Sequence, residues 1–142
     1  MNKSKKKRID APRKASNTGR WAETMCKALG KREASRWRFV SFRGKEGGEW
    51  RGIVDILAIR KDTSEPSKKG LKRGDLFEFI IIQIKGGKAR LPSPSDIQRL
   101  KLVAKHYKAK HIVLYEWKKG KKWHFKVWDG NWKPVKATEI FG

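Results

Sequence analysis

Three polar side chains of interest, Asp55, Gln83 and Lys85, lie in two largely apolar segments of the chain. Asp55 lies in segment 53–59, whose other residues are all apolar, and Gln83 and Lys85 lie two residues apart in segment 77–85. In a strand covered on both faces an unpaired carboxylate is expensive to desolvate, so Asp55 needs a compensating partner. Because side chains alternate along a strand, Gln83 and Lys85 share one face.

The two segments are expected to pair as antiparallel strands around the polar connection at residues 61–75. A register that sets Arg60 opposite Glu78 also sets Asp55 opposite Gln83. An acid, an amide oxygen and the neighbouring ammonium group then meet at one end of a buried sheet. The connection itself is typical of a solvated hairpin loop, with a basic flap as the alternative.

This set of groups can support phosphodiester hydrolysis. The reaction needs a cation to neutralise the phosphoryl oxygens, a bound water and a positive group near that water. Mg²⁺ accepts a few oxygen ligands and keeps several of its own waters. We therefore expect Mg²⁺ (or Mn²⁺) on the Asp55 carboxylate, the Gln83 amide oxygen and the Ile84 main-chain carbonyl, with Lys85 beside the water.

The charge of the chain indicates a polyanionic partner. Its 142 residues include 37 Lys and Arg against 14 acids, for a formal charge of +23. Nucleic acid is favoured over a membrane, since neither a basic amphipathic helix nor a long apolar segment is visible. A single cysteine, Cys26, excludes an internal disulfide framework. With no apolar signal region, we expect an intracellular protein, cytoplasmic or nucleoid-associated.

The elements that position these groups follow from local signals. We expect a helix from Asn17 or Thr18 to Gly30, strands at 36–42, 53–59 and 77–85, a helix begun by Ser93, Pro94 and Asp96, and a strand at 111–117. Ala22, Met25, Cys26 and Leu29 should face the core from the first helix, and Leu100, Val103, Ala104 and Tyr107 from the second. The strand–helix–strand order predicts a right-handed crossover, with strands 77–85 and 111–117 parallel.

The two ends of the chain are expected to extend this core. Residues 1–18 predict a basic, flexible tail that can grip phosphates. Residues 117–128 predict a hairpin with a basic turn, followed by a tight turn at 129–131 and a short strand from Trp132. Candidate nucleic-acid contacts are Lys5, Lys6, Lys7, Arg8, Arg43, Lys45, Arg51, Lys88, Arg90, Lys118, Lys119, Lys121 and Lys122.

The order of these motifs resembles the PD-(D/E)xK, or restriction-endonuclease-like, nuclease superfamily. Asp55, the later run Gln83-Ile84-Lys85-Gly86-Gly87, a Ser-rich step into a helix carrying Gln98, and an apolar strand are similar to the virus-type replication-repair nucleases and the archaeal Holliday-junction resolvases. The likeness covers roughly residues 19–117. One departure is Gln83, where the family usually has Glu, and this removes a negative charge from the metal site.

The resemblance implies both a fold and additional site residues. The fold is α/β, a single domain whose mixed central sheet has an α-β-β-β-α-β core over residues 19–117, with residues 118–142 as a C-terminal β-hairpin extension. The family's first-helix acid falls on Glu23, with Glu49 as the competing choice, and Gln98 supports the site. Taken alone, Glu23 is an ordinary acid of a first helical turn.

The leading hypothesis is a metal-dependent endonuclease that hydrolyses DNA, selective for structures such as junctions or flaps. RNA could also bind, and the resolvase likeness implies a homodimer. The first alternative is a non-catalytic nucleic-acid-binding protein that retains the nuclease fold. The second is a basic RNA-associated structural protein in which Arg51 or Lys85 neutralises Asp55.

Overall fold

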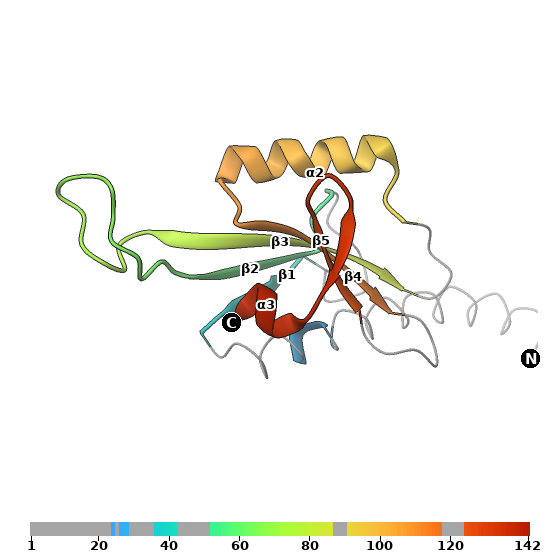
Figure 1. Ribbon diagram of the computed structural model, residues 1–142, viewed down its shortest axis with the longest axis horizontal. Helices are drawn as coiled ribbons and strands as arrows, with labels where there is room; N and C mark the ends of the chain where they lie inside the picture. The colour runs from blue at the N-terminus through green and yellow to red at the C-terminus, as the bar shows by residue number, and fades with distance from the viewer. Residues whose placement is uncertain (1–23, 25, 29–35, 43–51, 87–90, 118–123) are drawn as a thin grey trace, which may run out of the picture.

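Six strands form one mixed sheet at the centre of the molecule (Figure 1). The computed structural model describes residues 24, 26–28, 36–42, 52–86, 91–117 and 124–142, apart from the side chains of residues 86, 117 and 124. The predicted tail, residues 1–18, lies outside these ranges. In both chain order and spatial order the strands are β1 (Arg38–Ser41), β2 (Ile56–Lys61), β3 (Phe77–Gly86), β4 (His111–Trp117), β5 (His124–Trp128) and β6 (Trp132–Val135).

The directions of the strands confirm the expected mixed α/β sheet. β3 and β4 run parallel, and the other neighbouring pairs run antiparallel. A parallel pair needs a crossover connection, which here contains helix α2 (Pro94–Tyr107). The predicted strand–helix–strand unit is therefore confirmed.

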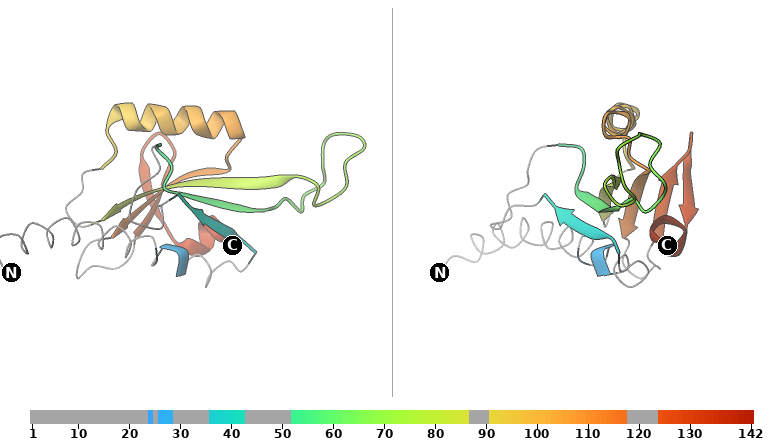
Figure 2. Two further views of the ribbon diagram at one scale, coloured as in Figure 1. Left: turned by 180° about the vertical axis from the view of Figure 1, so that it is seen from behind. Right: turned by 90° about the vertical axis from the view of Figure 1, so that its left-hand side faces the viewer.

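Helices lie on both faces of the sheet. Figure 2 shows α2 above one face, and the short helix α3 (Ala137–Phe141) below the other, together with the helical residues 26–28. The β-branched run of β3 suits a strand that is covered twice, since Ile80 and Ile82 are fully buried toward α3 while Ile81 packs toward α2.

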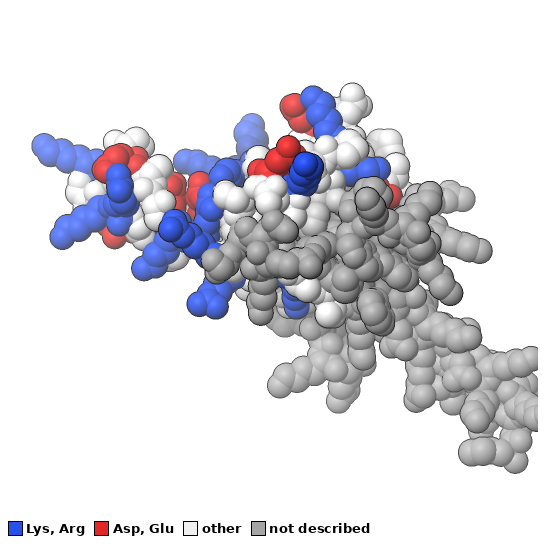
Figure 3. All heavy atoms as spheres, turned by 60° about the horizontal axis from the view of Figure 1, so that its bottom comes forward, with Lys and Arg blue, Asp and Glu red and all other residues white. Residues whose placement is uncertain are grey.

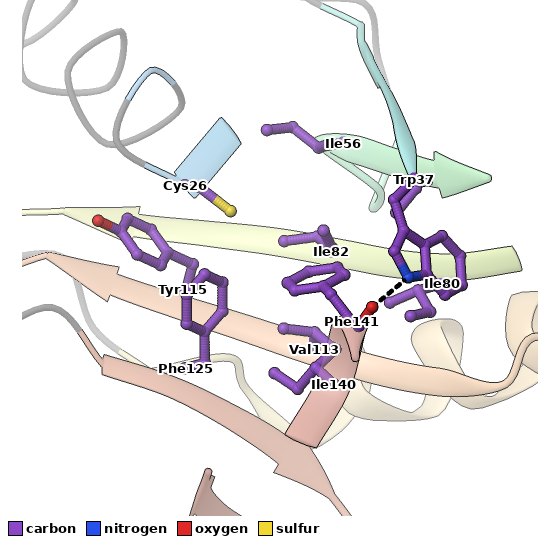
Figure 4. Packing of buried hydrophobic residues seen from close by; sticks show 11 residues of the cluster. Cys26, Trp37, Ile56, Ile80, Ile82, Val113, Tyr115, Phe125, Ile140 and Phe141 are labelled. Carbon is purple, nitrogen blue, oxygen red and sulfur yellow. Dashed lines mark hydrogen bonds between the residues drawn. The ribbon is translucent and has the colours of Figure 1, made fainter. Parts of the chain in front are cut away.

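The larger hydrophobic cluster lies on the α3 face (Figure 4). Phe141 makes edge-to-face contacts with Trp37, Phe39 and Phe125, at centroid distances of 6.0, 5.4 and 5.7 Å. The Trp37 Nε1–H donates to the Phe141 carbonyl at 2.8 Å. Cys26 is fully buried in this cluster as predicted, while Ala22, Met25 and Leu29 lie outside the described residues.

The start of α2 confirms the predicted capping signal. Ser93 is the N-cap and Pro94 the first helical residue. The Asp96 amide donates to Ser93 Oγ at 3.1 Å, and the Ser93 amide donates to Asp96 Oδ2 at 3.3 Å. Two amides left without intrahelical partners are thereby satisfied by each other's side chains.

The buried stripe of α2 is shorter than the sequence predicts. Leu100 is buried and Val103 and Ala104 pack beside it against the sheet. The prediction for Tyr107 is wrong, because its side chain is 59% exposed in the last turn of the helix. No helix among the described residues is long and apolar enough to cross a bilayer.

The C-terminal part contains the predicted hairpin and one unpredicted helix. β4 pairs with β5, and β5 pairs with β6 across the turn at 129–131. Gly130 occupies this turn at φ 75°, which costs glycine little. The basic turn at 118–123 lies outside the described residues. The sequence gives no sign of α3, although Ile140 and Phe141 are both buried.

Candidate active site

Asp55 is held between two strands just before β2 begins. The Phe42 amide donates to the Asp55 carbonyl at 3.2 Å, and the Asp55 amide donates to the Ile82 carbonyl at 3.0 Å. Residue 55 is therefore fixed by its backbone on both sides. Its half-buried side chain lies at the margin of the covered sheet.

The register between β2 and β3 is the one predicted. Arg60 lies opposite Glu78, and the strand pairing continues to Ile56 opposite Ile82. Asp55 follows next, and its Oδ2 accepts a hydrogen bond from the Ile84 amide at 2.7 Å. The carboxylate is thus attached to β3 between the two polar residues that the sequence singles out.

Gln83 presents a buried amide oxygen at this position. It shares the parity of Ile81, on the face that α2 covers, and only 6% of its surface is exposed. Its Oε1 has no hydrogen-bond partner among the residues that the structure describes. An unsatisfied buried acceptor costs about 1–3 kcal/mol, so this oxygen favours an added hydrogen-bond donor or a cation.

Lys85 lies two residues further along the same face. Its side chain is partly buried and makes no hydrogen bond or ion pair with any described residue. In β4 its register partner is Glu116, one strand away from Gln83. The ammonium group therefore remains available to an incoming anion.

Glu116 and Lys126 form an ion pair that the sequence analysis missed. Glu116 is 8% exposed, and its Oε1 lies 2.6 Å from the Lys126 Nζ. Strand parity puts both on the face of Gln83 and Lys85. An acid inside the apolar run of β4 was the available signal. Because Lys126 neutralises Glu116, this acid does not draw the charge of Lys85 away from the site.

Tyr115, the register partner of Ile84, belongs to the opposite face. Its ring packs on Phe125 at 5.0 Å in the α3-side cluster. Burial raises the pKa of the Tyr115 hydroxyl above its usual value, so it stays protonated at neutral pH. It therefore adds no charge to the sheet.

The remaining predicted site residues are not brought to this cluster by the described structure. Gln98 is exposed on α2, and its side chain makes no hydrogen bond to a described residue. Glu23 and Glu49 lie outside the described ranges, as do all thirteen predicted nucleic-acid contacts. Within those ranges, no group of three or more His, Cys, Asp or Glu could hold a metal ion.

An apolar pocket of about 320 Å³ lies beside the site, between the sheet and α2. It is lined by Phe42, Val54, Leu57, Phe79, Ile81, Val103 and Tyr107. Among these described side chains there is no carboxylate and no cation that could hold a metal or a phosphate.

The comparison with solved structures agrees with this architecture. The chain is similar to Hjc, a Holliday junction resolvase from the archaeal hyperthermophile Archaeoglobus fulgidus, with a TM-score of 0.51 and 16% identity. The match covers 84% of this chain and 99% of the resolvase chain. The chain has the restriction-endonuclease-like fold. The resemblance to the archaeal-resolvase branch is thus confirmed at the level of the fold.

The other two comparisons found nothing. No protein-family model matches the chain, and no curated protein sequence matches it.

Proposed function

We propose that this protein is a metal-dependent endonuclease that hydrolyses DNA phosphodiester bonds, selective for branched structures such as junctions or flaps. The observation that carries the proposal is the hydrogen bond from the Ile84 amide to Asp55 Oδ2. It joins the acid of one strand to the Gln83-Ile84-Lys85 run of the next. The fold of the resolvase-like neighbour and the charge of +23 support DNA as the substrate.

The donor set fits Mg²⁺ or Mn²⁺. Asp55 would supply a carboxylate, Gln83 its buried amide oxygen and Ile84 its carbonyl, with Glu23 or Glu49 as a further acid. Hard divalent cations prefer such oxygen ligands, and the unsatisfied Gln83 Oε1 agrees with this preference. When bound, the cation would neutralise charge on the phosphoryl oxygens and lower the pKa of a bound water.

The protein side chains have separate tasks in this mechanism. The Ile84 amide fixes the Asp55 carboxylate, so no reorganisation is needed when the substrate arrives. Lys85, which is unpaired among the described residues, would orient the attacking water and stabilise the charge that develops on the phosphate. Glu116 and Lys126 would keep the adjoining part of the face neutral.

Cleavage assays with an isosteric variant test the proposal. Supercoiled, branched and single-stranded DNA would be incubated with Mn²⁺ and wild type, Asp55→Asn or the control Asp129→Asn. We expect Asp55→Asn to lose activity by about 100-fold or more, because the amide removes the anionic ligand. Asp129→Asn, in the exposed β5–β6 turn, should cleave like wild type.

The alternative is a non-catalytic nucleic-acid-binding protein that retains the fold. It is favoured by Gln83 in place of the usual Glu and by the lack of a three-acid group among the described residues. On this alternative, no substrate is cleaved with Mg²⁺ or Mn²⁺, and Asp55→Asn binds DNA as wild type does. The other alternative, a basic RNA-associated structural protein, would need an ion pair from Lys85 or Arg51 to Asp55. The Lys85 side chain makes no ion pair with a described residue.

A further inference from the structure

The connection between β2 and β3 forms an ordered projection, which we call the arm (residues 60–78). Beyond the last strand pair, the Asp62 amide donates to the Leu76 carbonyl at 2.8 Å, and the Gly74 amide donates to the Asp62 carbonyl at 3.2 Å. Gly70 and Gly74 adopt φ of 93° and 89°, which side chains disfavour. Figure 1 shows the arm extending beyond the C-terminal end of α2. The turn geometry thus holds the loop in a defined shape.

The acidic side chains of the arm are used within it or at its base. Asp62 Oδ1 accepts from the Ser64 hydroxyl and amide, which lowers the pKa of the Asp62 carboxyl. Asp75 Oδ2 accepts from the Lys72 amide at 2.7 Å. The two remaining acids each pair with an arginine: Glu65 with Arg73 at 2.8 Å and Glu78 with Arg60 at 2.6 Å.

The lysines of the arm are left without such partners. Lys61, Lys68, Lys69 and Lys72 are exposed and make no ion pair with a described residue. Figure 3 shows blue side chains extending outward at this end of the molecule, with the red acids among them. An unpaired lysine is a point charge suited to phosphate, whereas both arginines, which could read a base in bidentate fashion, are occupied.

The arm lies at the end of the sheet opposite to the candidate active site. Six residues of β3 separate Phe77 from Gln83, which at about 3.3 Å per residue corresponds to about 20 Å. At about 3.4 Å per base pair along the duplex, that distance spans about 6 bp, and the lysines of the loop lie further out. The arm therefore cannot contact the phosphate that is cut.

We infer that the arm binds the sugar-phosphate backbone of a DNA duplex, about 6 bp or more from the scissile phosphate. This inference rests on the proposed function, because it takes DNA as the ligand of the site. The aromatic side chain of the arm, Phe77, lies at its base in β3, and the loop residues 62–76 that carry Lys68, Lys69 and Lys72 include no aromatic side chain on which unpaired bases could stack. A duplex therefore fits the loop better than a single strand. The contact is independent of sequence and depends on the length of the duplex.

The test measures how the affinity of the protein for DNA junctions depends on salt, with junctions whose duplex branches are either short or long. The variant is Lys68→Gln, Lys69→Gln and Lys72→Gln combined, and the control of equal charge change is Lys101→Gln, Lys133→Gln and Lys136→Gln. GC-rich four-way junctions with duplex branches of about 6 or about 18 bp would be titrated with each protein in EDTA, so that no cleavage occurs. Circular dichroism would establish that both variants are folded.

The expected effect of the arm variant on salt dependence differs between the junctions with long and short duplex branches. On the junction with long duplex branches, the slope of log affinity against log salt should become less steep by up to about 2.7 in the arm variant. This corresponds to about 0.9 for each lost phosphate contact. On the junction with short duplex branches, the arm variant and wild type should have the same slope. The control variant should change the slope by the same amount on both junctions, if it changes it at all.

Other outcomes overturn the inference. If the slope of the arm variant falls equally on both junctions, the substitutions have changed only the overall charge. If the slope falls on neither junction, these lysines make no contact with the DNA. The cleavage assay separates this question from the proposed function. If no DNA is cleaved but the effect of the arm variant depends on branch length, the nuclease proposal is wrong and the inference about the arm stands. If DNA is cleaved and Asp55→Asn abolishes cleavage, but the effect of the arm variant does not depend on branch length, only the inference about the arm is wrong.

Discussion

At the scale of single residues, the candidate site departs from its expected composition at Gln83. Its amide oxygen is buried and has no partner among the described residues, next to the Ile84 amide that holds the Asp55 carboxylate against β3. A glutamate there would add a charge close to Asp55. Without a cation two neighbouring carboxylates repel each other, and with one they share it.

We predict that Gln83→Glu binds Mn²⁺ about 10-fold more tightly, because a carboxylate replaces a neutral ligand. The metal-free variant should also have a lower free energy of unfolding, which Mn²⁺ restores. Calorimetric titration and thermal unfolding measure the two effects. Asn131→Asp, in an exposed turn, is the matched control and should change neither. Equal metal affinities for Gln83→Glu and wild type would remove residue 83 from the ligand set.

At the scale of elements, α2 shows how local chemistry defines an end. Ser93, Pro94 and Asp96 lie within four residues, so their contribution does not depend on the rest of the fold. Leu100, further along, is buried only because the helix packs on the sheet. The start of α2 was therefore predictable residue by residue, while the exposure of Tyr107 was not.

We predict that Ser93→Ala lowers the free energy of unfolding by about 1 kcal/mol, because the Asp96 amide loses its acceptor. Ser93→Asp should restore most of this stability, since aspartate caps equally well. Urea denaturation of the three proteins measures the differences. A stable Ser93→Ala protein would mean that packing alone holds the first turn.

At the scale of the whole molecule, the two ends of the described chain are joined through the core. Trp37 and Phe141 are separated by 104 residues and share a buried hydrogen bond of 2.8 Å. Arg60 lies over the Trp37 ring at 4.4 Å, which connects this contact to the base of the arm. The C-terminal helix thus completes the face of the sheet opposite to the candidate site.

We predict that Trp37→Phe lowers the free energy of unfolding by about 1–3 kcal/mol, because the Phe141 carbonyl stays buried without its donor. Trp132→Phe is the comparison: the Trp132 Nε1 is buried and has no partner among the described residues, so its loss leaves no acceptor unsatisfied. Chemical denaturation should therefore show the smaller loss for Trp132→Phe. The reverse order would assign the stability of this core to ring packing alone.

The core strands, the crossover and the β2–β3 register as far as Ile56 were predictable from the amino-acid sequence. Apolar parity, capping residues and the Arg60–Glu78 pairing are local or pairwise signals, and a one-residue slip would have turned every side chain to the wrong face.

The features around these core strands depend on contacts between residues that are far apart in the chain. α3 is five residues long and exists because Ile140 and Phe141 fill a space between distant strands. The Glu116–Lys126 pair likewise depends on which strands become neighbours. So does the lack of a described partner for the Gln83 amide oxygen. No local pattern records that choice, because it follows from how the whole chain excludes water.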